Sequence, residues 1–237
     1  MHPNPGRLVN LGECSSGQVA GTAPTLVVPV GSIEQHGPHL PLDTDTRIAT
    51  ALARRVAERL GHLLAPAIAY GAAGEHQGFA GTVSIGTAAL GAVLVEYARS
   101  ACDWADRVVF VNGHGGNLDA LRPAVTTLRS EGREVAWAGG CADAVDAHAG
   151  HTETSVLLHL CPALVLADRL APGNTEPLVA LMPALRRAGM AAVSPSGVLG
   201  DPTTATAEEG ERIFSGMVQD CLHRVRRWAP GPDGMLS

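Results

Sequence analysis

The segment VPVGSIEQHGPHLPLDTDTRIA, residues 28–49, gathers side chains that can bind metal ions. After a short apolar run it carries Glu34, His36, His39, Asp43 and Asp45. Connecting loops are usually polar, but they rarely collect two imidazoles and three carboxylates over so short a distance. Imidazole and carboxylate ligands without thiolates favour Zn, Fe(II) or Mn over a structural cysteine site. The segment therefore indicates metal-dependent chemistry.

Three further loops carry side chains of the same kinds. GAAGEHQGF contains Glu75 and His76, NGHGGN contains His114, and DAHAGHTETS contains His148 and Glu153. Six of the ten histidines lie in the four loops, namely His36, His39, His76, His114, His148 and His151. Each loop follows an apolar run that reads as a buried strand, and ligands of α/β folds bind beyond the carboxyl ends of such strands. The sequence therefore predicts that these side chains converge on one site.

The elements that must position this site alternate between strand and helix. Valine- and alanine-rich runs predict buried strands at residues 25–30, 63–70, 108–111 and 134–138. Helical spacing predicts helices at 46–61, 87–105 and 118–132, a helix beginning at 153, and a last helix at about 207–227. The last one opens with the capping box Thr206-x-x-Glu209. This order predicts one α/β domain with a mostly parallel sheet covered on both faces.

Composition and charge exclude several classes of protein. The net charge of −6 argues against a nucleic-acid partner. No apolar run is long enough to span a bilayer, and the first residues lack the apolar core of a signal peptide. The five cysteines are scattered, which suits a reducing compartment. We expect a cytoplasmic protein without a membrane partner, in which residues 1–23 are loosely ordered and 24–237 form the single domain.

Simpler explanations exist for individual residues. Asp45 sits just before the predicted helix at 46, where it could turn inward or merely cap that helix. His114 could be a turn residue, and Glu153 an ordinary first-turn carboxylate. Serine-nucleophile chemistry lacks a G-x-S-x-G elbow, because Ser32 has no such glycine spacing. Four polar loops after four strands favour the metal interpretation over these separate ones.

Five segments, in the same order along residues 25–212, resemble the creatininase (creatinine amidohydrolase) family of binuclear metal hydrolases. They are PVGSIEQHGPHLPLDTD, GEHQGFAGTVSIG, VNGHGGN, HAGHTETS and GVLGDPTTATAEEG. The resemblance implies a three-layer α/β/α sandwich and an enzyme that hydrolyses C–N amide bonds with two divalent metal ions, Zn, Fe(II) or Mn. It also implies a homo-oligomer.

The resemblance also implies roles for individual residues. Asp45 would bridge the two metals, Glu34 and His114 would hold one, and His36 and Glu153 would hold the other. In creatininase proper the last carboxylate follows the NGH histidine by two residues, where this chain has Gly116, so the role is assigned to Glu153. His148 would transfer a proton or polarise the scissile carbonyl. Substrate contacts or outer contacts to the ligands are expected from His39, Asp43, Glu75, His76, Gly115 and Gly116.

Finer resemblance is to the mycofactocin-system branch of the family. Members of that branch are peptidases that release the modified C-terminal Val-Tyr dipeptide of a precursor peptide. Residues 139–147, GGCADAVDA, lack the tryptophans that close the creatininase pocket, so a planar creatinine ring would be held poorly. We therefore expect a modified precursor peptide as substrate. The alternatives are hydrolysis of a small cyclic amide or formamide, and a non-catalytic metal-binding protein.

Overall fold

The structure is a computed structural model that describes residues 9–139 and 146–237. Within these residues the sheet has five parallel strands in the order β1-β3-β2-β4-β5. The strands are β1 (Val9–Asn10), β2 (Thr25–Val30), β3 (Leu63–Leu64), β4 (Arg107–Asn112) and β5 (Val135–Gly139). The predicted parallel sheet is confirmed.

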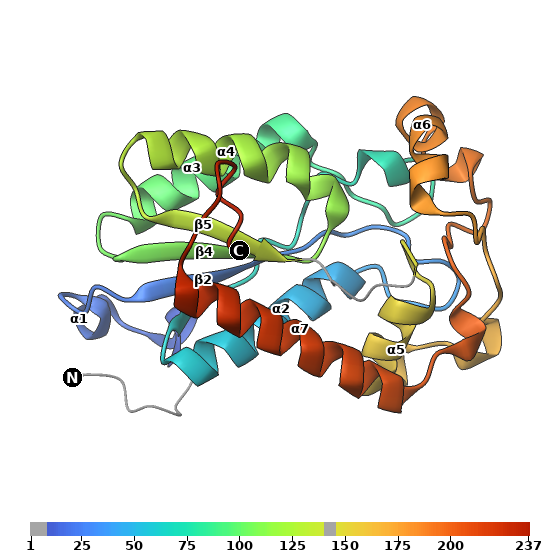
Figure 1. The fold of residues 1–237 in the computed structure, drawn as a ribbon, viewed down its shortest axis with the longest axis horizontal. Helices are drawn as coiled ribbons and strands as arrows, with labels where there is room; N and C mark the ends of the chain where they lie inside the picture. The colour runs from blue at the N-terminus through green and yellow to red at the C-terminus, as the bar shows by residue number, and fades with distance from the viewer. Residues whose placement is uncertain (1–8, 140–145) are drawn as a thin grey trace.

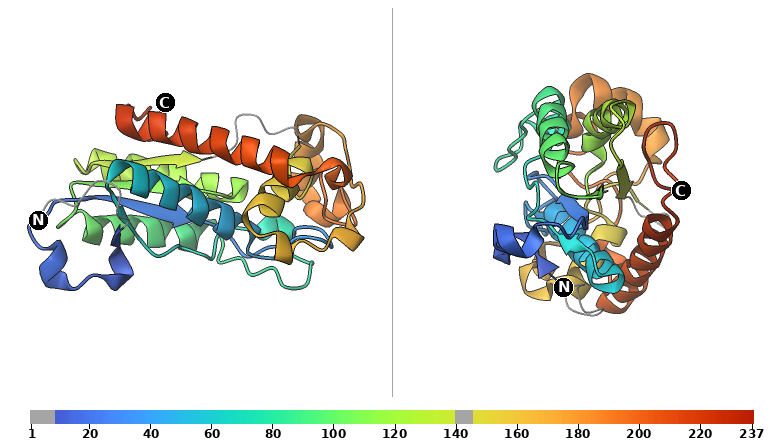
Figure 2. Two further views of the ribbon diagram at one scale, coloured as in Figure 1. Left: turned by 90° about the horizontal axis from the view of Figure 1, so that it is seen from below. Right: turned by 90° about the vertical axis from the view of Figure 1, so that its left-hand side faces the viewer.

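Helices cover both faces of the sheet (Figures 1 and 2). The helices of the described residues are α1 (Ser16–Val19), α2 (Thr44–Leu60), α3 (Thr87–Ala101), α4 (Leu118–Ser130), α5 (His151–Leu160), α6 (Leu178–Ala188) and α7 (Ala207–Arg227). Successive residues of a strand point to opposite faces. Val27 and Val109 therefore pack in the core beneath α2, α5 and α7, whereas Val28 and Phe110 pack beneath α3 and α4. The result is the expected three-layer sandwich.

The register of the central strands places their carboxyl ends at one edge. β2 and β4 pair from Thr25 with Arg107 through to Val30 with Asn112. Asn112 in turn pairs with Gly139 of β5. Because the three strands are parallel and end together, the loops that leave them begin side by side.

Several element boundaries differ from those predicted. The strand predicted at 63–70 is reduced to Leu63–Leu64, because Pro66 has no N–H to donate, and only an isolated bridge joins Ile68 to Val30. The first long helix begins at Thr44 rather than at residue 46. The helices predicted at 87–105 and 118–132 end at 101 and 130, and α5 begins at 151 rather than 153. The sequence analysis did not predict α6.

The N-terminal segment contains regular secondary structure, and the last helix begins where the sequence predicts. Residues 9–20 lie inside the segment expected to be loosely ordered, and they form β1, a short 3-10 helix (Leu11–Glu13) and α1. The hydroxyl of Thr206 accepts a hydrogen bond from the backbone N–H of Glu209 at 3.1 Å and starts α7 as predicted. Most of segment 139–147, which lacks the tryptophans of creatininase, lies outside the described residues. None of the helices in residues 9–139 and 146–237 combines the length and apolar character that a bilayer span requires.

Candidate metal centre

The predicted metal ligands meet at the carboxyl edge of the sheet. Glu34 and His36 follow β2, His114 follows β4, and Asp45 and Glu153 lie in the first turns of α2 and α5. Close approach of these elements depends on Gly113, since a Cβ there would lie 2.5 Å from the backbone oxygen of Asp45. Chain segments that are far apart in sequence thus bring their polar side chains together.

Glu34, Asp45 and His114 form one buried group that could hold a metal ion. His114 Nδ1 lies 3.1 Å from Glu34 Oε2 and 3.2 Å from Asp45 Oδ2. The hydroxyl of Ser32 contacts the same two carboxylates, at 2.8 Å from Glu34 Oε2 and 2.5 Å from Asp45 Oδ2. Two carboxylates and one imidazole therefore face a common point.

His36, His148 and Glu153 form a second such group. His36 Nε2 lies 3.2 Å from Asp45 Oδ1 and 3.9 Å from Glu153 Oε2. Asp45 thus directs Oδ1 toward His36 and Oδ2 toward His114. A carboxylate whose two oxygens face two ligand groups has the arrangement that a bridging ligand requires.

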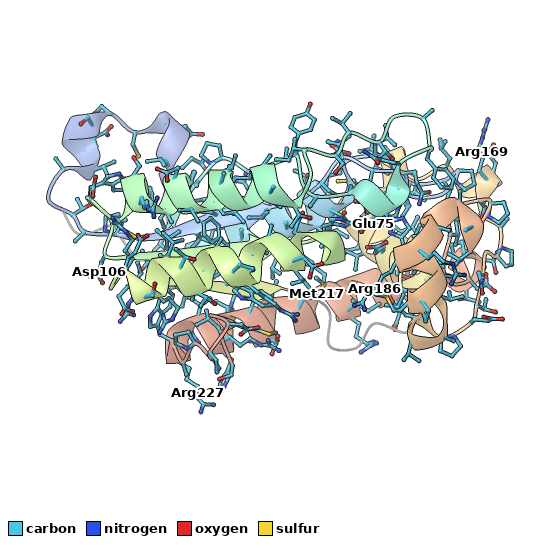
Figure 3. The ribbon with its side chains drawn as sticks, turned by 90° about the horizontal axis from the view of Figure 1, so that it is seen from above. Glu75, Asp106, Arg169, Arg186, Met217 and Arg227 are labelled. Carbon is cyan, nitrogen blue, oxygen red and sulfur yellow. The ribbon has the colours of Figure 1, made fainter. Side chains whose placement is uncertain are left out.

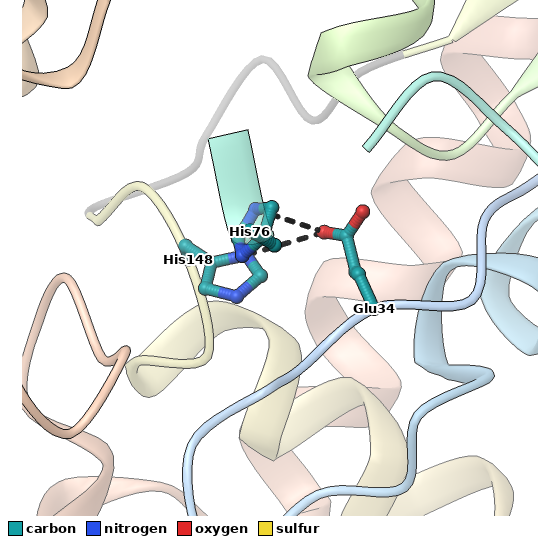
Figure 4. A group of neighbouring side chains, drawn as sticks. All are labelled: Glu34, His76 and His148. Atoms are coloured by element: carbon teal, nitrogen blue, oxygen red, sulfur yellow. Dashed lines mark ion pairs between the residues drawn. The ribbon is translucent and has the colours of Figure 1, made fainter. Parts of the chain in front are cut away.

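Glu34, His76 and His148 form a third group (Figure 4). Glu34 Oε1 lies 3.3 Å from His76 Nε2 and 3.7 Å from His148 Nδ1. This oxygen is buried and has no hydrogen-bond partner among the described residues. Burying an unbonded carboxylate oxygen costs free energy unless a cation compensates for it. The donor set therefore fits a bound metal ion.

Charges within the cluster shift pKa values strongly. Burial raises the pKa of Glu34, and the Asp45 carboxylate raises it further. Burial disfavours the charged form of His36, but the carboxylates of Asp45, Glu153 and Glu34 together outweigh burial and raise the pKa of His36 to about 10. Burial also opposes ionisation of Asp45, yet His36 and His114 hold its pKa well below the usual value. The carboxylates therefore favour positive charge between them, which a divalent cation supplies.

Glu153 and His148 lie in contrasting environments. Burial raises the pKa of Glu153 to about 7, although His36 lowers it. Its Oε2 also accepts a hydrogen bond from the backbone N–H of Ala149 at 2.6 Å, beside its contact to His36. Burial, His36 and His76 hold the pKa of His148 well below its usual value. His148 is therefore a neutral imidazole near pH 7.

Two residues expected near the ligands lie apart from the cluster. Asp43 pairs with Arg47 at 2.6 Å and is one-third exposed. His39 is buried and contacts the hydroxyl of Thr154 through Nε2 at 2.9 Å, which ties the loop after β2 to α5. The expectation that Asp45 might cap α2 also differs from the structure, because Asp43 occupies the N-cap position and the Asp45 side chain turns inward.

Two partners that hold these ligands in place, Ser32 and Gln35, are not evident as such from the sequence. Gln35 Nε2 lies 2.8 Å from His76 Nδ1 and 3.1 Å from the backbone oxygen of Gly197. The period-two spacing of Ser32, Glu34 and His36 was a signal that Ser32 shares their side of the chain.

A cavity of about 540 Å³ opens onto the ligands. From the ligand groups it is lined by Asp45, His76, His114, His148 and Glu153, with Glu75, Gly115 and Gly116 beside them. From α6 it is lined by Leu178, Met182, Leu185 and Arg186, and Figure 3 labels Glu75 and Arg186. The cavity is therefore polar on the side of the ligand groups and largely apolar on the side of α6.

Comparison with known proteins places the chain in a family. Residues 13–225 match the Creatininase family, described as creatinine amidohydrolase. The mycofactocin precursor peptide peptidase of Mycobacterium ulcerans (strain Agy99) is 63% identical over 239 residues, covering 97% of this chain and 96% of that protein. The Mycolicibacterium smegmatis peptidase of the same name is 59% identical, covering 96% and 94%.

Solved creatininase structures share the fold. A tryptophan-to-phenylalanine variant aligns with a TM-score of 0.77 at 30% identity, covering 94% of this chain and 99% of that one. The manganese form aligns with a TM-score of 0.75 at 28% identity, covering 95% and 100%. With a family match over nearly its whole length and the same arrangement of strands and helices, the chain belongs to the creatininase family.

Proposed function

We propose that this protein is a metal-dependent peptidase that cleaves the mycofactocin precursor peptide and releases its modified C-terminal Val-Tyr dipeptide. The relatives that carry the name mycofactocin precursor peptide peptidase are 59% to 63% identical over nearly the whole chain. The main structural support for metal-dependent hydrolysis is the orientation of Asp45, which directs one carboxylate oxygen to each of two ligand groups.

Two divalent ions would share Asp45. Glu34 and His114 would complete one site, and His36 and Glu153 the other. The chemistry that such ions supply when bound is polarisation of the scissile carbonyl and a lowered pKa of water. Nitrogen and oxygen ligands accept Zn, Fe(II) and Mn, so the donor set leaves these three as candidates.

His148 is suited to move a proton within this site. Its Nε2 lies 2.8 Å from the backbone oxygen of Gln35, which can only accept, so Nε2 carries the hydrogen. Nδ1 then has a free lone pair, and it faces Glu34 at 3.7 Å. A neutral imidazole in this orientation can take up a proton at Nδ1 and pass it to the leaving amine. Backbone N–H groups around Gly115 and Gly116 line the same cavity and could bind the carbonyl oxygen.

The cavity favours a peptide over a small amide. Its volume of about 540 Å³ lies within the range of roughly 300–1,000 Å³ typical of ligand pockets. One wall is the apolar side of α6, with Leu178, Met182 and Leu185. An aliphatic and aromatic dipeptide would bury apolar surface against this wall. Hydrolysis of a small cyclic amide or formamide is the alternative, since the Pseudomonas putida creatinine amidohydrolase is 30% identical over 90% of this chain.

Mass spectrometry of products from a substrate panel tests the proposal. The panel contains the modified precursor peptide, creatinine and a formamide, each incubated with protein loaded with Zn, Fe(II) or Mn. We expect a two-residue fragment from the peptide alone. Turnover of creatinine or the formamide with the peptide intact would favour the alternative, and bound metal without hydrolysis of any amide would favour a binding protein.

We also propose that the chain forms a homo-oligomer and acts in the cytoplasm. Val93 on α3 and Val179 on α6 are 43% and 80% exposed, and an interface would cover such apolar surface. Free thiols on Cys14, Cys102, Cys161 and Cys221 are compatible with a reducing compartment. Light scattering after size-exclusion chromatography measures the number of chains in the assembly. A monomer at working concentration would contradict the proposed homo-oligomer.

A further inference from the structure

The two ring nitrogens of His114 face different surroundings. Nδ1 points at Glu34 and Asp45, at 3.1 and 3.2 Å. Nε2 lies 3.3 Å from the backbone oxygen of Ala72 and 3.5 Å from Glu75 Oε1. A carbonyl oxygen can only accept a hydrogen bond, so the neutral ring carries its hydrogen on Nε2. This leaves the lone pair of Nδ1 directed at the candidate metal site.

Glu75 reaches His114 from a separate part of the chain. It lies in the 3-10 helix Gly74–His76, which contacts α6, and it is labelled in Figure 3. Its side chain is 32% exposed, in contrast to the buried carboxylates of Glu34 and Asp45. It belongs to none of the three ligand groups formed by the described residues. Its carboxylate therefore lies on the outer side of the imidazole.

Gly116 provides the space in which Glu75 and His114 meet. A Cβ at residue 116 would lie 2.4 Å from Glu75 Oε1, 2.4 Å from His114 Nε2 and 2.6 Å from the backbone oxygen of Ala72. The same atom added at Gly115 would meet nothing within 4 Å. The backbone of Gly116 does not adopt a left-handed conformation. Residue 116 is therefore limited to glycine by space and not by its φ angle.

We propose that Glu75 is a positioning residue for His114, and that the contact between them requires glycine at position 116, where a side chain would occupy the same space. This rests on the proposed metal-binding role of His114. A carboxylate on the outer nitrogen of a ligand histidine fixes its tautomer and ring orientation and strengthens it as a ligand. A glutamate at 116, which the family resemblance implies for creatininase proper, would enter the volume that Glu75 and His114 fill. In this chain, therefore, the Glu75 carboxylate contacts His114 on the side away from the metal site, and the Glu153 carboxylate lies within the metal site beside His36.

The first experiment compares Glu75→Ala and Glu75→Gln with Asp119→Asn in the full-length chain. Asp119 is an exposed carboxylate that lines the same cavity, so its variant controls for the loss of one negative charge. Zinc affinity is measured by competition with a fluorescent chelator. We expect the Glu75→Ala variant to bind zinc at the site formed by Glu34, Asp45 and His114 about 10–100-fold less tightly than the wild type. The Glu75→Gln variant should lose less, and Asp119→Asn should match the wild type.

The second experiment compares Gly116→Ala with Gly115→Ala. The added methyl group at 116 should displace Glu75 or His114 and weaken zinc binding at least tenfold, whereas the one at 115 should leave zinc affinity unchanged. Ring ¹⁵N NMR of the zinc-loaded protein should show hydrogen on His114 Nε2 in the wild type and a changed His114 signal in Glu75→Ala. Circular dichroism of the metal-free variants checks that they fold.

Two results would overturn the inference. Unchanged zinc affinity in Glu75→Ala together with a raised KM for the peptide would make Glu75 a substrate contact. Equal zinc affinity in Gly116→Ala and Gly115→Ala would show that residue 116 has no special role. The zinc affinities and the NMR signal of His114 can be measured without peptide cleavage. A wild-type protein that binds zinc but cleaves no amide would therefore contradict the proposed function and leave this inference standing.

Discussion

At the scale of single residues, the two carboxylate oxygens of Asp45 contact two different histidines. Oδ1 contacts His36 and Oδ2 contacts His114, while the Ser32 hydroxyl holds the Oδ2 side. A substitution at this position should affect both ligand groups at once. Substitution of a residue in one group should leave the other group able to bind.

We predict that Asp45→Ala abolishes peptide turnover, with a loss of at least a thousandfold in kcat. Removing the shared carboxylate also leaves His36 and His114 without their common partner. Initial rates on the modified precursor peptide measure the effect. Asp43→Ala is the matched control, because Asp43 pairs with Arg47 at the surface and should retain wild-type rates. Comparable losses in the two variants would contradict a special role for Asp45.

His148→Ala should lower kcat by about 10²–10⁴-fold, the usual contribution of a general acid or base, while bound metal stays unchanged. The Nδ1 of His148 is free because its Nε2 donates to Gln35. Atomic emission spectroscopy of the purified variant gives the metal content beside the rate. Loss of metal from this variant would make His148 a ligand instead.

The convergence of the candidate ligands could be predicted from the sequence, whereas the groups that support them could not. Glu34, His36 and His114 stand out because metal-binding side chains are concentrated after predicted strands. Ser32 and Gln35 do not stand out, since serine and glutamine are common in loops and their partners are distant in sequence. Gln35, for example, contacts His76 and the backbone of Gly197. Only the folded chain brings these contacts together.

At the scale of secondary-structure elements, α6 decides what the cavity can hold. Its inner side presents Met182 and Leu185, and Leu181 anchors the helix beside Met190 and Leu199. The sequence analysis did not predict this helix. Pro183 lies inside it, and its N-cap residue Pro177 offers no side chain that could cap it.

Met182→Gln tests α6 as a specificity element. We expect kcat/KM for the peptide ending in Val-Tyr to fall roughly fivefold, because about 1 kcal/mol of apolar contact is lost. A peptide ending in Ala-Ala should lose less. Ala180→Gln on the same helix is the control, since Ala180 is exposed and is not among the residues that line the cavity. Equal effects on both peptides would argue against contact between Met182 and the released fragment.

Strand prediction succeeded where packing and local pattern agree. β2 matches the predicted run because its residues from Leu26 to Val30 are buried, with apolar side chains on both faces. The strand predicted at 63–70 failed after Leu64, because Pro66 has no N–H to donate to the ladder and only an isolated bridge at Ile68 follows. The site survives this error, because Glu75 and His76 return to the sheet edge through the 3-10 helix Gly74–His76.

At the scale of the whole molecule, folding concentrates buried negative charge at one end of the sheet. Glu34 and Asp45 are both buried, and a metal ion that binds only the folded chain stabilises it by mass action. At about 100 times its Kd, zinc should contribute roughly 2.7 kcal/mol and raise the unfolding midpoint by roughly 5–10 °C. Differential scanning calorimetry with and without a chelator measures this. An unchanged midpoint would contradict metal binding by the native state.

If two metal ions share Asp45, each chain should bind two metal equivalents, and this number can be measured. Inductively coupled plasma mass spectrometry would be applied to the wild type and to His36→Ala after zinc loading and removal of free metal. We predict two equivalents in the wild type and one in His36→Ala, because Glu34, Asp45 and His114 keep their own site. One equivalent in both proteins would contradict the two-metal centre.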